Sequence, residues 1–345
     1  MGGASSGLAI ARPRRSSCSA GSFLRVHRLL LRAGSALIIT VAESALPGDA
    51  DQSGRWSNEI SGYSLLLIWL VGFFVFTLGP TIASIYLSFT DYDLARPPFW
   101  VGFDNYVKIA TDDPKFREAM HVTFVYVLFS VPLKLLMALA IAMALNKGLR
   151  GLSVYRAIFY LPSLLGGSVA IAILWRQFFS TDGLITYLMR FAGYDGPGWI
   201  TTPDHALDTL IILSVWQFGS PMIVFLAGLR QIPRDMYEAA SIDGASKIRQ
   251  FFKITLPLLT PVIFFNLVVQ TIDAFKAFTP AFIVSSGTGG PVDSTLFYTL
   301  YLYQEAFTFL RMGNASALAV ILVAIIAAFT AIAFASSRLW VHYDD

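Results

Sequence analysis

Three polar residues interrupt an otherwise apolar stretch around position 270. Asn266, Gln270 and Asp273 are spaced i, i+4 and i+7, so a helix would place all three on one face. Amides and carboxylates inside a membrane are costly unless they face a cavity or one another. In suitable pairs they donate hydrogen bonds to hydroxyl groups and accept hydrogen bonds from them. The pattern therefore predicts a path for a polar solute, with Ser214 and Gln217 contributing from a second helix.

A structural role for the same residues is the alternative. On a helix, Asp273 could form an ion pair with Lys276, three residues later. Asn266 and Gln270 could hydrogen-bond to neighbouring helices and so hold a helical bundle together. The two interpretations differ in whether these side chains line a cavity.

Other residues that commonly do chemistry are sparse or badly spaced. Cys18 is the only cysteine, and the four histidines are far apart in the sequence and lack metal-motif spacing. No H-E-x-x-H motif is present, which disfavours an intramembrane enzyme. The chain also lacks a G-x-x-x-x-G-K-S/T phosphate loop, since the glycine-rich stretch 287–291 is not followed by a lysine. We therefore expect no catalytic residue, no metal and no cofactor bound by this chain itself.

The composition indicates an integral membrane protein. Hydrophobic residues make up 55% of the 345 residues and charged residues only 14%, with a mean hydropathy of +0.62. A soluble domain contains about 25% charged residues, because its water-facing surface needs them. The net charge of +3 does not point to nucleic acid, and no nucleic-acid partner is expected. The prediction is an all-α polytopic membrane protein.

Six segments meet or approach the roughly 20 apolar residues that a membrane-spanning helix needs. They are Ile60–Thr90, His121–Asn146, Ala157–Trp175, Thr209–Leu229, Leu259–Val284 and Met312–Ser337. If the N-terminus is cytoplasmic, sixteen lysines and arginines fall on the cytoplasmic side and seven on the opposite side. Basic residues concentrate in cytoplasmic loops, so the sequence predicts that both termini are cytoplasmic.

The first 58 residues differ from the rest of the chain. Their apolar run Leu29–Ala42 contains Arg32 and is too short for a membrane span. A signal-like segment is an alternative, but its cleavage would invert the topology favoured by the basic residues. We predict that residues 1–58 form a basic tail that is disordered or arises from a start-site extension. A membrane domain over residues 59–345 would follow.

A charged segment separates the fourth and fifth spans on the predicted cytoplasmic side. Pro233 suits a first helical turn, and Gly244 can adopt the left-handed conformation that ends a helix. We predict a helix–turn–helix bracket over about residues 233–256, with Ala239 and Ala240 exposing a closely approachable surface. An amphipathic helix resting on lipid headgroups is the alternative.

The bracket carries a pattern that resembles a known signature. Glu238-Ala239-Ala240, followed by Gly244 and then by Ile254, Leu256 and Pro257, resembles the EAA motif of membrane subunits of binding-protein-dependent ABC importers. The resemblance implies a type I ABC importer permease fold with six transmembrane helices in a bacterial inner membrane. It also implies that the bracket is a coupling helix that docks into a groove on an ATPase. The implied coupling residues are Glu238, Ala239, Ala240, Asp243, Gly244 and Ala245.

Other segments resemble the carbohydrate branch of these importers, of the maltose and glycerol-3-phosphate type. They are Gly102–Tyr106, Arg156–Pro162 with Trp175 and Asp182-Gly183, and Gly287–Pro291 with Thr295, Tyr303, Ala306 and Phe307. The resemblance implies a sugar or polyol substrate that an extracytoplasmic solute-binding protein delivers. It further implies a second permease subunit and a cytoplasmic ABC ATPase dimer, which would bind ATP-Mg in place of this chain.

Two other transport functions are alternatives. The chain could be an ABC permease for a different small solute. It could also be a proton-coupled secondary carrier, with Asp273 and Glu305 as titrating groups and no ATPase partner. The missing phosphate loop together with the EAA-like bracket favours a translocation subunit whose energy comes from a partner.

Overall fold

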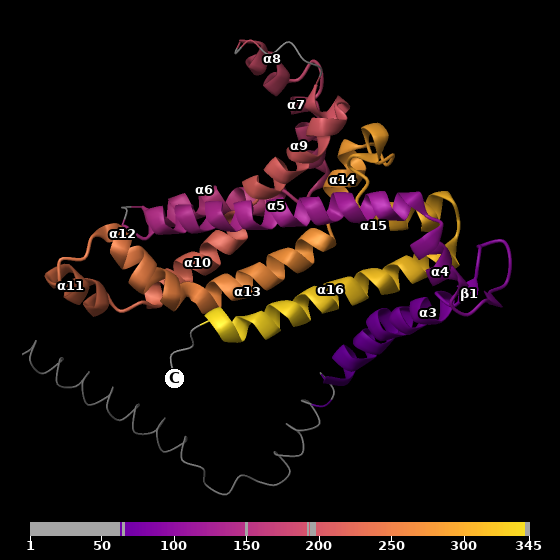
Figure 1. The fold of residues 1–345 in the computed structure, drawn as a ribbon, viewed down its shortest axis with the longest axis horizontal. Helices are drawn as coiled ribbons and strands as arrows, with labels where there is room; N and C mark the ends of the chain where they lie inside the picture. The colour runs from indigo at the N-terminus through magenta and orange to yellow at the C-terminus, as the bar shows by residue number, and fades with distance from the viewer. Residues whose placement is uncertain (1–62, 64–65, 149–150, 192, 194–197, 342–345) are drawn as a thin grey trace, which may run out of the picture. The chain divides into compact units, whose positions relative to one another are not determined.

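The computed structural model describes Tyr63 and residues 66–148, 151–191, 193 and 198–341 (Figure 1). The predicted tail over residues 1–58 lies outside the described residues. The described residues are mostly helical and include one short β-ladder. In that ladder β1 (Thr90–Asp91) pairs antiparallel with β2 (Phe99–Trp100).

The described α-helices follow one another along the chain from position 79 to position 340. They are α3 (Gly79–Leu87), α4 (Asp104–Thr111), α5 (Pro114–Leu145), α6 (Leu152–Leu165), α7 (Val169–Phe178), α8 (Leu184–Phe191), α9 (Pro203–Trp216), α10 (Gly219–Gln231), α11 (Arg234–Ile242), α12 (Lys247–Gln250), α13 (Leu256–Phe275), α14 (Thr279–Val284), α15 (Tyr298–Tyr303) and α16 (Met312–Trp340). Short π-helical segments are η1 (Phe74–Leu78), η3 (Phe251–Thr255) and η5 (Gln304–Thr308), and 3₁₀ turns are η2 (Trp199–Thr201) and η4 (Pro291–Asp293).

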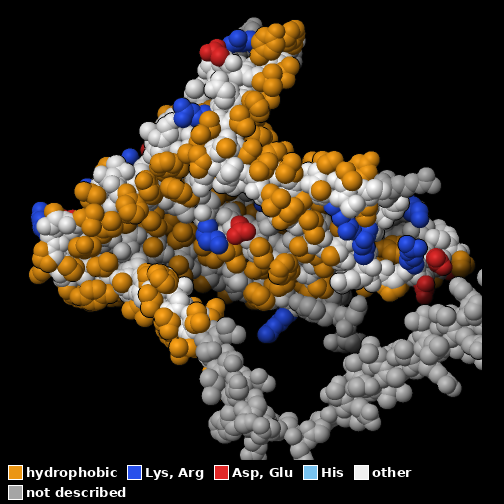
Figure 2. Space-filling model, turned by 180° about the vertical axis from the view of Figure 1, so that it is seen from behind, with side chains coloured by type: hydrophobic (Ala, Val, Ile, Leu, Met, Phe, Trp, Pro, Cys, Tyr) orange, Lys and Arg blue, Asp and Glu red, His pale blue; other side chains and the backbone are white. Residues whose placement is uncertain are grey.

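Four helical runs among the described residues are long and apolar enough to cross a membrane. They are Leu66–Leu87, Pro114–Leu145, Lys247–Val284 and Met312–Trp340. The bent pairs α6–α7 and α9–α10 meet the same criterion, so counting each pair as one span gives the six predicted spans. Hydrophobic side chains cover most of the described surface visible in Figure 2, as lipid contact requires.

The chain divides after Phe76 into two compact units. In the described part of the first unit, the helix that starts at Leu66 stacks Trp69 on Phe73, with 5.5 Å between ring centroids. The unit from Thr77 onward contains the remaining spans.

The helix α5 is the packing centre of the unit that begins at Thr77, and it contacts α9, α10, α13 and α15. Asp113 caps its N-terminus by accepting a hydrogen bond from the Phe116 amide (3.0 Å), and Pro114 opens the first turn. Leu135 of α5 and Phe225 of α10 belong to the buried apolar core. In Figure 1, α11 and α12 lie near one end of α5, and α4 and β1 lie near its other end.

The third and fourth predicted spans are each broken into two helices. The third bends by 91° between α6 and α7, and the fourth bends by 41° between α9 and α10. The two breaks bond to each other, since Gln217 Nε2 donates to Gly166 O (3.1 Å) and Ser163 Oγ donates to Gln217 O (2.9 Å). These bonds satisfy backbone groups that an interrupted helix leaves without partners, which is what a break at membrane depth requires.

The last span begins where a glycine allows close contact with the β-ladder. The Gly313 amide donates to Tyr92 O (2.9 Å), and a Cβ atom on Gly313 would lie 2.1 Å from Thr90 O. The N-terminus of α16 is thus held against the β1 segment, and no side chain fits between them.

We expect Gly313→Ala to destabilise the protein by about 1–3 kcal/mol, because the added methyl forces the backbone apart. The measurement is the thermal unfolding midpoint of the purified protein in detergent. Gly72→Ala is the matched control, because a Cβ atom on Gly72 meets no described heavy atom within 4 Å. Equal midpoints for the two variants would contradict this packing account.

Candidate functional site

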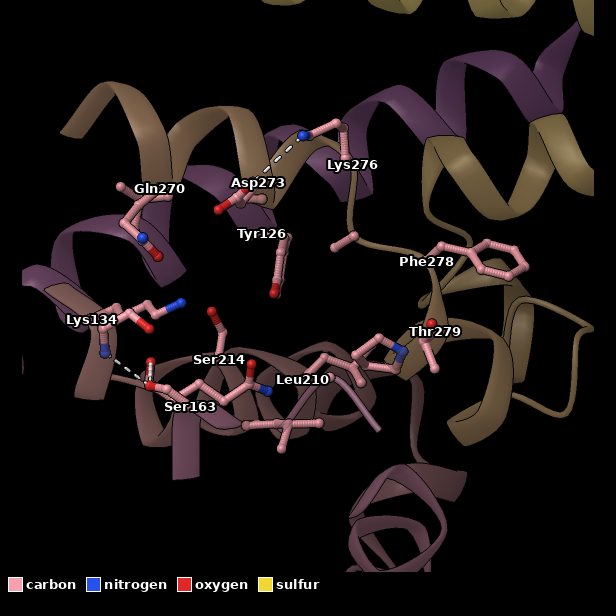
Figure 3. Close-up of a pocket in the computed structure, with 18 residues that line it drawn as sticks. Tyr126, Lys134, Ser163, Leu210, Ser214, Gln270, Asp273, Lys276, Phe278 and Thr279 are labelled. Carbon is pink, nitrogen blue, oxygen red and sulfur yellow. Dashed lines mark hydrogen bonds and ion pairs between the residues drawn. The ribbon is translucent and has the colours of Figure 1, made fainter. Parts of the chain in front are cut away.

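A polar cavity of about 360 Å³ lies between the broken spans and the fifth span (Figure 3). Its polar and charged lining residues are Tyr126, Lys134, Ser163, Ser214, Gln217, Ser220, Gln270, Asp273, Lys276 and Thr279. They come from α5, α6, the segment α9–α10, α13 and the start of α14. The cavity therefore brings hydroxyl, amide and charged groups together within a protein whose outer surface is largely apolar.

Four of the five predicted path residues meet at this cavity. Ser214 and Gln217 line it from one side, and Gln270 and Asp273 line it from α13. Asn266 is the exception: it is 2% exposed, and its Nδ2 donates to Val262 O (3.2 Å) on the same helix. The three residues share one face of α13, but only Gln270 and Asp273 line the cavity, and Asn266 lies outside its lining.

The predicted ion pair between Asp273 and Lys276 is present. Asp273 Oδ1 lies 3.5 Å from Lys276 Nζ. Both side chains also line the cavity, so the ion pair is compatible with the solute-path interpretation. The pair is more than half exposed, with side-chain exposures of 59% for Asp273 and 55% for Lys276. Its carboxylate and ammonium are therefore accessible from the cavity.

Sequence reasoning missed part of the lining on α5 and α6. Tyr126 and Lys134 face the cavity from α5, and Ser163 faces it from α6. The signal for the first two was their spacing of eight residues, which places both on one side of a helix. Ser163 carried no such signal, because its position depends on the bend after α6 and on its bond to Gln217 O.

The predicted bracket is present as α11, a turn and α12, which leads through η3 into α13. Gly244 has φ +75°, as predicted. The Ala245 amide donates to Ala240 O (2.9 Å) and the Gly244 amide donates to Ser241 O (3.1 Å), the two bonds of a Schellman helix end. Pro233 precedes the helix as its N-cap instead of standing in its first turn.

The predicted coupling residues lie on an accessible surface. Glu238, Ala239, Asp243 and Gly244 are exposed, and Ala240 and Ala245 are half-buried. Ile242 beside them is 87% exposed, which is unusual for an isoleucine outside the apolar spans. The turn therefore exposes small, acidic and apolar groups on one surface.

Side chains that sequence reasoning missed fix the bracket. Gln250 is 4% exposed, and its Nε2 donates to Ser241 Oγ (2.9 Å) and to Ala245 O (3.2 Å) across the turn. Tyr237 Oη and Thr255 Oγ1 are hydrogen-bonded at 2.9 Å, which ties α11 to η3. A glutamine in a polar segment gives no sequence signal for such a role, because only the folded turn places both acceptors around it.

Glu305, a titrating candidate for the carrier alternative, is enclosed by partners. It is 3% exposed, accepts a hydrogen bond from Asn314 Nδ2 (2.8 Å) and lies 3.7 Å from Arg311 Nη1. Nearby, the Tyr301 hydroxyl donates to Asp113, and burial together with that carboxylate raises the pKa of the Tyr301 phenol. This cluster joins α15 and η5 to the starts of α5 and α16.

Comparison with known proteins identifies the class of protein to which this architecture belongs. Residues 64–341 match the family described as "Binding-protein-dependent transport system inner membrane component". The chain belongs to this family and is a membrane-spanning permease component of an ABC transport system. Family membership decides against the proton-coupled carrier.

Individual relatives align with this chain over most of their own length. The probable ABC transporter permease protein YesP of Bacillus subtilis (strain 168) is 52% identical over 289 residues, covering 84% of this chain and 94% of that protein. The sulfoquinovosyl glycerol transport system permease protein SmoG of Agrobacterium fabrum is 34% identical over 294 residues, covering 82% and 94%. A subunit in the crystal structure of a bacterial alginate ABC transporter matches with a TM-score of 0.70 and 22% identity, covering 83% of this chain and 96% of that chain. This last match confirms the type I importer permease fold.

We expect Gln250→Ala to loosen the bracket without unfolding the spans, because it removes both hydrogen bonds across the turn. Exchange of the Gly244 and Ala245 amides, which are hydrogen-bonded in the turn, should accelerate about ten-fold, corresponding to about 1.4 kcal/mol of local stability. Gln231→Ala, at an exposed glutamine that ends α10, is the matched control. Unchanged exchange in Gln250→Ala would show that the turn does not depend on these bonds.

Proposed function

We propose that this chain is the translocation subunit of an ATP-driven importer for a sugar or polyol in a bacterial inner membrane, with both termini cytoplasmic. Its partners would be a second permease subunit, a cytoplasmic ABC ATPase dimer that binds ATP-Mg, and an extracytoplasmic solute-binding protein. Relatives in the same family are ABC transporter permeases, which supports this assembly.

One observation carries the proposal: a single helical run joins the bracket to the cavity. The run Lys247–Val284 starts directly after the turn at Gly244 and includes Gln270 and Asp273 of the cavity lining. Gln270 lies 14 residues beyond Leu256, a distance of about 21 Å along an α-helix. A displacement of the bracket would therefore reach the cavity through one continuous element.

The mechanism that follows is alternating access. Closure of the ATPase dimer would move the surface around Glu238 and Gly244, and α13 would carry that motion to the cavity. The cross-bonded breaks at Gly166 and Gln217 are the elements against which α13 would shift. This chain contributes positioning and movement, and ATP hydrolysis belongs to the partner.

A carbohydrate is the solute class that the cavity and the relatives support. Hydroxyl and amide groups dominate the polar lining, and these groups match the hydroxyls of a sugar. The relative SmoG is named for sulfoquinovosyl glycerol, a glycosyl compound. The loop Gly287–Pro291, which resembles that of sugar permeases, is held by an internal hydrogen bond from Thr295 Oγ1 to Gly289 O (2.8 Å).

We expect Glu238→Lys to abolish association with the ATPase while the protein stays in the membrane. The substitution reverses an exposed charge at the centre of the coupling surface. Co-purification of an ATPase with the tagged permease is the measurement. Glu118→Lys makes the same charge change at an exposed position on α5 and should retain the ATPase. Full co-purification and uptake in Glu238→Lys would refute the coupling role.

We expect Gln270→Ala to lower ATP-dependent uptake about ten-fold in proteoliposomes, because a lost hydrogen bond to a solute is worth about 1–2 kcal/mol. The assay uses the assembled transporter and the carbohydrate that its binding protein binds best. Asn266→Ala is the contrast: it lies on the same helix outside the cavity lining and should lower stability without changing KM. Equal uptake by wild type and Gln270→Ala would remove the cavity from the solute path.

A further inference from the structure

The charges in the cavity do not balance. Lys134 of α5 and Lys276 after α13 contribute two positive groups, and Asp273 is the single carboxylate among the lining residues. Asp273 is already paired with Lys276 at 3.5 Å. The lining therefore carries a net charge of one positive unit, and that excess resides at Lys134.

Lys134 is deep in a span and has no direct partner among the described residues. It stands 20 residues after Pro114 in α5, which is about 30 Å along the helix, and 11 residues before the helix ends at Leu145. The half-buried side chain makes no hydrogen bond or ion pair with any residue that the structure describes, and Asp273 acts on it only through longer-range electrostatics. An ammonium group at such depth is costly unless an anion reaches it.

The surroundings of Lys134 supply the other contacts that a carbohydrate needs. Figure 3 shows Lys134 pointing into the same space as Tyr126, Ser214 and Gln270. These groups donate and accept hydrogen bonds but carry no negative charge. The volume of about 360 Å³ is within the range of sites that hold small molecules.

We propose that the cavity selects a carbohydrate bearing an anionic substituent, with Lys134 as the residue that recognises the negative group. A carboxylate, sulfonate or phosphate would satisfy the unpaired ammonium by a charge-assisted hydrogen bond, and hydroxyl groups would bond to the neutral lining. This inference rests on the proposed function and narrows its substrate class. Neutral sugars offer the Lys134 ammonium no anionic group that it can contact directly.

The test is equilibrium binding to the assembled permease–ATPase complex in nanodiscs, without the solute-binding protein, which would impose its own selectivity. The probes are two matched pairs, galacturonate with galactose and glucuronate with glucose. The acidic member of at least one pair should bind about ten-fold more tightly or better, because a charge-assisted hydrogen bond is about twice as strong as a neutral one. Lys134→Met should erase that preference, and Lys134→Arg should retain it.

Lys108→Met is the matched control, since it removes the same charge from an exposed side chain on α4 and should keep the preference. Co-purification of the partner subunits shows that each variant has assembled. Equal or tighter binding of the neutral sugars, failure of both acidic sugars to bind, or an unchanged preference in Lys134→Met would overturn the proposal.

A separate measurement tests the importer function on which this inference rests. ATP-dependent uptake of a neutral sugar in the same preparation would leave the importer function standing, whereas loss of ATPase co-purification from wild type would refute that function itself.

Discussion

Every backbone amide and carbonyl at membrane depth needs a hydrogen-bond partner, and this constraint governs the structure from the third span onward. A continuous helix satisfies it automatically, but a cavity between helices requires that some of them bend. Here the two bent spans satisfy each other: Gln217 bonds to Gly166, and Ser163 bonds to Gln217. Without those bonds, the breaks would expose unpaired polar groups and the cavity would have no stable wall.

The same bonds give Gln217 two roles. Its side-chain amide holds the break after α6, and it also lines the cavity beside Ser214. The close approach is strict, since a Cβ atom on Gly166 would lie 2.3 Å from the Gln217 side chain. The break after α6 and the wall of the cavity therefore share Gln217, and a substitution of this residue would affect both.

On the opposite side of the cavity, α13 connects two surfaces of different chemistry. At its start, Gln250 and the Tyr237–Thr255 pair fix an exposed turn that is small and acidic. Near its other end, Gln270 and Asp273 line the polar cavity. The helix continues from Leu256 through Pro261 to Phe275, so a single helical run connects the exposed turn to the cavity.

The sequence by itself determined the all-α membrane class, the six apolar segments and the bracket with its left-handed Gly244, because hydropathy, helix periodicity and turn chemistry are local properties. It also placed Gln270 and Asp273 on one helical face. Only the tertiary structure decided that Asn266 lies outside the cavity lining, that Ser163 joins the lining, and that Gln250 bonds across the turn. Those outcomes depend on bends and helix contacts between residues far apart in the chain, and no local pattern encodes which side of a polar helix will meet a neighbour.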